Sequence, residues 1–123
     1  MKYLITLLIF ISAPVWAAWE EVVTGVSGDV AYIDPATIKK DGSIRRVWGL
    51  TDLANPTSEG ILSRRYLREI DCKNERTRIL TISGHSKAMG DGVTLGINAE
   101  AQSWNYIAPE TVMSFIQKRV CSN

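Results

Sequence analysis

Two cysteines, Cys72 and Cys121, restrict this chain more than any other residues, because a bond between them joins its middle to its C-terminal end. Such a bond closes a loop of about 50 residues, to which the chain-entropy model assigns roughly 4 kcal/mol of stability. In an oxidising compartment an even pair is most simply a disulfide. The alternative, a free nucleophilic cysteine, needs a neighbouring base, and His85 is the only histidine. Whether the cysteines form a disulfide or remain free therefore depends on the cellular compartment.

Residues 1–17 predict a secretory signal peptide. Lys2 supplies the positive start, residues 4–11 form an apolar run too short to span a membrane, and residues 15–17 fit a small-residue cleavage site. A buried core helix and an uncleaved anchor are the alternatives. We expect cleavage and export, which leave a single mature domain over residues 18–123 with its two cysteines disulfide-bonded.

The expected destination is the periplasm, the cell surface or the extracellular medium. No cysteine follows the apolar run, so the residue that carries the lipid of a bacterial lipoprotein is missing. We therefore expect a mature chain without a membrane anchor. The formal net charge is +1, and losing Lys2 with the leader brings it to zero. A domain that binds nucleic acid normally carries a basic excess, so we expect no nucleic-acid partner.

Glycine and Asp/Asn clusters interrupt the mature region at short intervals, which is typical of a β-rich domain. Asp41–Gly42 is a strong hairpin signal, because glycine tolerates the positive φ that such turns need. Six runs of strand-forming residues lie between the breaks, at residues 19–23, 30–34, 44–53, 61–72, 76–85 and 93–98.

Helical spacing occurs near the C-terminus. Four apolar residues there predict one stripe that packs on a core: Val112, Phe115, Ile116 and Val120. Pro109 suits the first turn of this helix. Since Cys121 ends the helix and Cys72 ends a strand, their disulfide would hold the helix on one face of the sheet.

The hairpin between residues 61 and 85 has a predictable register. A two-residue loop at residues 74–75 pairs Asp71 with Arg78 and Leu67 with Ile82, so opposite charges meet and apolar side chains meet. If the disulfide faces the helix, the other face of this hairpin carries three apolar residues: Leu67, Leu80 and Ile82. One helix cannot cover both faces, and a folded-back strand, a second protomer or a partner must cover this one. We expect a homodimer or a protein-partner surface there.

Local basic residues offer a candidate binding patch at Arg64, Arg65 and Arg68. Its partner would be acidic, either a polyanion or an acidic protein surface. The alternative is a solvated sheet face, partly neutralised by Glu69 and Asp71. Three tryptophans are candidate ligand-stacking platforms, although in so small a domain they more often belong to the core: Trp19, Trp48 and Trp104.

The sequence offers no convincing catalytic or metal site. Ser83, His85 and Asp91 are close together, but the first two alternate on a strand and no Gly-x-Ser-x-Gly elbow surrounds the serine. One histidine and two bonded cysteines do not supply the usual zinc ligands, and Asp91 lacks the alternating oxygen ligands of a calcium loop. We therefore expect a non-enzymatic protein with no catalytic residues, no bound metal and no cofactor.

An ordered set of landmarks resembles the surface-adhesin protein E-like family of Gram-negative bacteria over residues 18–123. These landmarks are Tyr32-Ile33-Asp34, Asp41-Gly42, Val47-Trp48-Gly49-Leu50, Asp71-Cys72, Met89-Gly90, Trp104, Pro109-Glu110-Thr111 and Val120-Cys121.

The resemblance implies an α+β domain: an antiparallel sheet of about six strands with a C-terminal helix packed on one face and tethered by a disulfide. It also implies surface exposure, a possible dimer, and binding of host matrix or serum proteins such as vitronectin, laminin or plasminogen. The alternative from another class is a periplasmic inhibitor or regulator, for example of a cell-wall hydrolase, in which a projecting loop at residues 86–92 plugs an active site.

Overall fold

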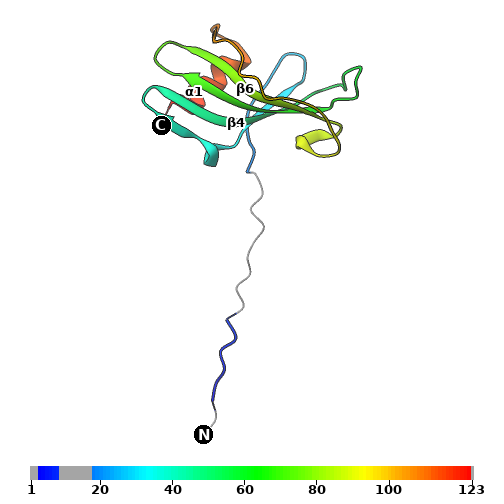
Figure 1. The fold of residues 1–123 in the computed structure, drawn as a ribbon, viewed down its shortest axis with the longest axis vertical. Coiled ribbons are helices and arrows are strands. Elements are labelled where there is room, and N and C mark those ends of the chain that lie inside the picture. The colour runs from blue at the N-terminus through cyan, green and yellow to red at the C-terminus, as the bar shows by residue number, and fades with distance from the viewer. Residues whose placement is uncertain (1–2, 9–17, 123) are drawn as a thin grey trace.

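The computed structural model describes residues 3–8 and 18–122 (Figure 1). The expected cleavage site at residues 15–17 lies outside the described residues. Residues 3–8 are exposed and have no regular secondary structure. Neither of the two described ranges contains a helix that is both long and apolar enough to cross a membrane.

Residues 20–121 form one antiparallel sheet and one α-helix, which confirms the expected fold class. The elements are β1 (Glu20–Thr24), β2 (Val30–Ile33), η1 (Pro35–Thr37), β3 (Lys39–Asp41), β4 (Ile44–Asp52), β5 (Ser63–Asp71), β6 (Arg76–His85), η2 (Ala88–Gly90), β7 (Thr94–Asn98), β8 (Asn105–Tyr106) and α1 (Val112–Cys121). Six strands lie side by side in the order β1-β2-β4-β5-β6-β7. The short strands β3 and β8 pair with β4 and β6.

The β3–β4 connection is the hairpin that Asp41–Gly42 predicts. Asp41 pairs with Ile44, and Gly42 has a φ of 58°, a conformation that residues with a Cβ rarely adopt. The turn therefore follows from local residues alone.

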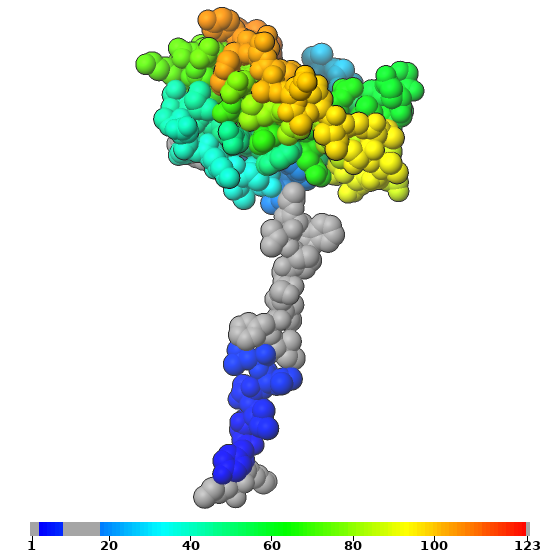
Figure 2. Space-filling model, in the orientation of Figure 1, coloured from blue at the N-terminus to red at the C-terminus, as the bar shows by residue number. Residues whose placement is uncertain are grey.

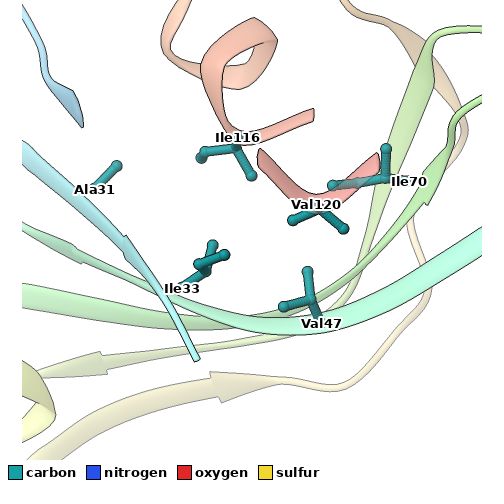
Figure 3. Packing of buried hydrophobic residues seen from close by; sticks show 6 residues of the cluster. All are labelled: Ala31, Ile33, Val47, Ile70, Ile116 and Val120. Carbon is teal, nitrogen blue, oxygen red and sulfur yellow. The ribbon is translucent and has the colours of Figure 1, made fainter. Parts of the chain in front are cut away.

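The helix α1 covers one face of the sheet and forms the core with it. Ile116 and Val120 point from α1 toward the sheet residues of a buried cluster (Figure 3), namely Ala31, Ile33, Val47 and Ile70. Full burial of side chains of this size contributes about 1.5–3 kcal/mol each. The Cys72–Cys121 disulfide, with Cα atoms 5.8 Å apart, holds the end of α1 beside this core.

Two details of the helix differ from the expectation. The helix begins at Val112, after Pro109, because Thr111 is its N-cap and exchanges capping hydrogen bonds with Ser114. The apolar stripe is also narrower than predicted, since Val112 is 40% and Phe115 47% exposed. Only its inner part packs on the sheet.

The predicted register of β5 and β6 is wrong. Glu69 pairs with Arg78, and the connection between the strands spans residues 72–75. The Asp71 carboxylate stabilises this longer turn by accepting hydrogen bonds from the backbone N–H groups of Lys73 and Asn74 and from the Asn74 side chain.

A register shift between Leu67 and Arg68 changes the pairing again further along the hairpin. Beyond it, Leu67 pairs with Thr81, and Tyr66 pairs with Ile82. Since paired residues share a face, Leu67 and Ile82 lie on opposite faces of the sheet.

Candidate functional site

The face of the sheet opposite α1, here called the open face, carries the candidate functional residues. Val47 of β4 packs under the helix, so its neighbours Arg46 and Trp48 face the other way. Their partners on β5, Glu69 and Leu67, share that face. Figure 2 looks onto the open face, with the red helix hidden behind the sheet.

Two adjoining hollows lie on the open face and together make what we call the Trp48 groove. The first has a volume of about 240 Å³ and is lined by Trp19, Asp34, Thr37, Trp48 and Arg65. The second has a volume of about 380 Å³ and is lined by Ala36, Thr37, Lys39, Arg46, Trp48 and Leu67. Thr37 and Trp48 belong to both, so they form the boundary between the hollows.

The short helix η1 is fastened to β4 and shapes the groove. Asp34 is its N-cap and accepts a hydrogen bond from the Ala36 N–H at 3.2 Å. The Thr37 hydroxyl donates to the Asp34 carbonyl at 2.7 Å and accepts from the Trp48 N–H at 3.1 Å. These bonds bring residues 34–37 to Trp48, a placement that the alternation of β4 alone does not reveal.

The expected patch of Arg64, Arg65 and Arg68 is divided between the two faces, because β5 is a strand and successive side chains alternate. Arg65 lies on the open face, with its guanidinium carbon 6.0 Å from the centre of the Trp19 ring. Arg64 and Arg68 lie on the helix side, paired with Thr51 and Val47.

Arg68 serves the helix contact. Its Nη1 donates to Met113 Sδ at 2.9 Å, and its guanidinium carbon lies 5.1 Å from the centre of the Tyr66 ring. Burial lowers the pKa of Arg68. This side chain is therefore engaged under α1 and does not form a surface patch with Arg65.

The expected partner face is divided as well. Leu67 lines the Trp48 groove on the open face, whereas Ile82 is on the side of Tyr66. Leu80 is half-buried and follows Ile79, at the register shift. Only Leu67 of the three contributes to the groove.

Other cations of the open face are matched by acids. Glu69 accepts hydrogen bonds from Arg78 at 2.7 and 3.0 Å and lies 3.8 Å from Arg46. Arg76 Nε donates to Asp71 at 3.0 Å. Hydrogen bonds from the Asn74 side chain and backbone, together with Arg76, lower the pKa of Asp71 to about 2.

Trp104 adds an aromatic contact to this charged network. The guanidinium carbons of Arg76 and Arg78 each lie 4.8 Å from the centre of its ring. Two cations of the chain therefore already contact this indole, whereas none among the described residues stacks on Trp48.

Arg65 and Lys39 differ from these paired cations. Within the described part of the chain, no carboxylate oxygen lies within 4.0 Å of either head group. Arg65 Nε is also buried without a hydrogen-bond partner among the described residues. A buried donor without a partner costs free energy, but the remaining guanidinium N–H groups carry the charge to the groove that Arg65 lines. The groove therefore presents unpaired positive charge beside an indole ring.

The residues near His85 do not form a triad. Ser83 Oγ lies 2.8 Å from His85 Nε2, but the hydrogen-bond partner of Nδ1 is the Thr94 hydroxyl at 3.5 Å, not a carboxylate. Burial, followed by the positive charge of Arg65, lowers the pKa of His85. Within the described residues, no group of three His, Cys, Asp or Glu side chains could hold a metal ion.

The loop at residues 86–92 is fastened to the sheet by hydrogen bonds. Met89 N–H donates to Asp52 Oδ1 at 2.7 Å, and Gly90 N–H donates to Ser63 Oγ at 2.9 Å. Ser63 is fully buried and in turn donates to the Lys87 carbonyl. The loop is therefore part of the open face.

Comparisons with known proteins agree with the fold. The family model described as surface-adhesin protein E matches residues 19–122. A structure of Haemophilus influenzae protein E superposes with a TM-score of 0.68 at 16% identity and covers 91% of both chains. Its crystal form II gives 0.67 at 17%, covering 88% of this chain and 90% of that one.

Protein E from non-typeable Haemophilus influenzae gives a TM-score of 0.59 at 18% identity, covering 91% of this chain and 80% of the other. No curated protein matches by sequence. At these identities the structural likeness establishes the fold alone.

Proposed function

Because this chain belongs to the surface-adhesin protein E family, we propose that it is an exported, non-enzymatic binding module that is displayed at the cell surface and attaches to host matrix or serum proteins. The observation that carries the proposal is the family match, which spans nearly all of the folded domain. Resemblance of fold alone would be weaker support, since one fold serves many functions.

The chemistry of the open face supports a binding role. Its charged groups and aromatic rings can contact a partner. The Ser83–His85 pair is not arranged for catalysis, because the Thr94 hydroxyl stands where a catalytic carboxylate would orient the imidazole. A serine without that orientation is a poor nucleophile.

The protein partner is expected to meet the open face. Leu67 and Trp48 supply apolar surface there, and Arg65 supplies a charge with no carboxylate partner among the described residues. Aromatic and arginine side chains are the groups that most often dominate interface energies. A second copy of the chain is the alternative occupant, and light scattering coupled to size-exclusion chromatography distinguishes it.

The alternative role, a periplasmic inhibitor or regulator of another protein, loses its main structural argument. It needs a loop that enters an active site, and residues 86–92 are instead bonded to Asp52 and Ser63. No other observation in the described residues favours it.

Two measurements test the proposal together. Protease treatment of intact cells should remove the protein while a periplasmic marker stays intact, and the purified mature chain should bind immobilised vitronectin, laminin or plasminogen with a micromolar or tighter Kd. Protection in intact cells with release by osmotic shock, together with no binding to these three proteins, would refute it.

A further inference from the structure

We propose that the Trp48 groove binds acidic oligosaccharides, with one sugar ring in each hollow on either side of Trp48. The inference rests on the proposed binding function and names a ligand class for the open face. Sulfated or uronate-containing sugar chains are its intended ligands.

The shape of the groove suits sugar rings. One hollow, of about 380 Å³, lies at the lower end of the ~300–1,000 Å³ usual for small-molecule sites, and the other, of about 240 Å³, lies just below that range. Trp48 borders both, and Trp19 lines the first. A pyranose ring has an apolar face of C–H groups that packs on the flat indole, while its hydroxyls remain at the rim for hydrogen bonds.

The charges of the groove select an acidic sugar. Arg65 and Lys39 line it without a carboxylate partner, Arg46 lines it while lying 3.8 Å from Glu69, and among the described residues Asp34 is its one acidic lining residue. The Asp34 carboxylate is already engaged by the Ala36 N–H. Arg65 lines the first hollow with no carboxylate partner in the described part of the chain, and a guanidinium binds a carboxylate or sulfate through two parallel hydrogen bonds.

The position of the groove argues against an extended acidic peptide. β4 forms its floor and is paired with β2 and β5 on its two sides, so its backbone cannot take an additional strand. Peptides recognised by sheets gain much of their affinity from such strand addition at an edge. A ligand in this groove is recognised by side chains only, which suits a ligand rich in hydroxyl and anionic groups.

Titration calorimetry of the purified mature protein with a heparin-derived tetrasaccharide tests the inference. We expect saturable binding with a Kd of about 1 mM or tighter that weakens as NaCl is raised, because salt screens the charge contacts. Maltotetraose, which is neutral, should bind at least about tenfold more weakly.

Two variants and a matched control locate the site. Arg65→Gln and Trp48→Phe should each weaken tetrasaccharide binding, the first by about tenfold or more. Arg64→Gln removes the same charge from the adjacent position on the other face and should leave the Kd within about twofold. Equal weakening by Arg64→Gln, no saturable binding, or equally tight binding of a poly-glutamate peptide would overturn the inference.

The same protein, tested on deglycosylated and untreated laminin, separates the two proposals. If the tetrasaccharide fails to bind but both laminins do, the groove inference is refuted and the proposed function stands. If neither the sugar nor any of the host proteins binds, both are refuted.

Discussion

Removing the disulfide should cost this domain much of its stability. In a Cys72→Ala/Cys121→Ala variant, the unfolded chain regains the freedom that a bond across 49 residues removes. The chain-entropy model gives about 4 kcal/mol for a loop of this length. Both half-buried cysteines also pack against the core, so lost contacts add to this figure. Since domains of this size are stable by only about 5–15 kcal/mol, the loss is a large fraction of the total.

Urea unfolding followed by tryptophan fluorescence measures this loss. With a slope of about 1–3 kcal/mol/M, a loss of 4 kcal/mol lowers the midpoint by about 1–4 M. The wild-type protein unfolded in the presence of a reductant is the matched control and should behave like the variant. A loss below about 1 kcal/mol in both samples would show that α1 is held by packing alone.

Three further changes test other parts of the structure. Ile70→Ala should lower the free energy of unfolding by about 2–5 kcal/mol in urea, because Ile70 is fully buried beneath α1; a loss under 1 kcal/mol would contradict that packing. Asp71→Asn should reduce the loss of stability that the wild type shows as the pH falls from about 4 to 2, because the folded carboxyl has a pKa of about 2 and the unfolded one about 3.9. An unchanged acid profile in the variant would refute this. The pKa of His85 is lowered in the folded protein, so the unfolded chain takes up a proton first and wild-type stability should decline below about pH 6.5. In the His85→Gln variant this decline should be weaker. If wild-type stability instead rises as the pH falls through this range, the predicted direction of the His85 pKa shift is wrong.

The features that the sequence predicts correctly depend on nearby residues or on one strong covalent constraint. Asp41–Gly42 specifies its turn locally, Ile116 and Val120 show their helical spacing directly, and the two cysteines have only each other to pair with. For these features, local chemistry and the final structure agree.

The errors arise where side chains override the simplest pairing. A two-residue loop is the shortest connection, but hydrogen bonds to the Asp71 carboxylate stabilise a longer turn. The register shift beside Leu67 then places Ile82 on the other face. The prediction of an arginine patch requires that neighbours in sequence are neighbours in space. In a strand that assumption fails, since Arg64 and Arg65 point in opposite directions.

The groove could be anticipated only in part. Arg46 and Trp48 alternate on one strand, so their common face is readable from the sequence. Asp34 and Thr37 join them through hydrogen bonds across the chain, which no local pattern reveals.

The position of α1 in the chain has a consequence for biogenesis. Arg119 of α1 binds Glu20 of β1 at 2.6 Å, so the last helix and the first strand meet directly. A ribosome or a translocation pore would release every strand before the segment that shields Val47 and Ile70 emerges. One hydrophobic face of the nascent sheet therefore stays exposed until α1 packs on it. During this period chaperones and an oxidase would act, and a truncated product would be open to proteases.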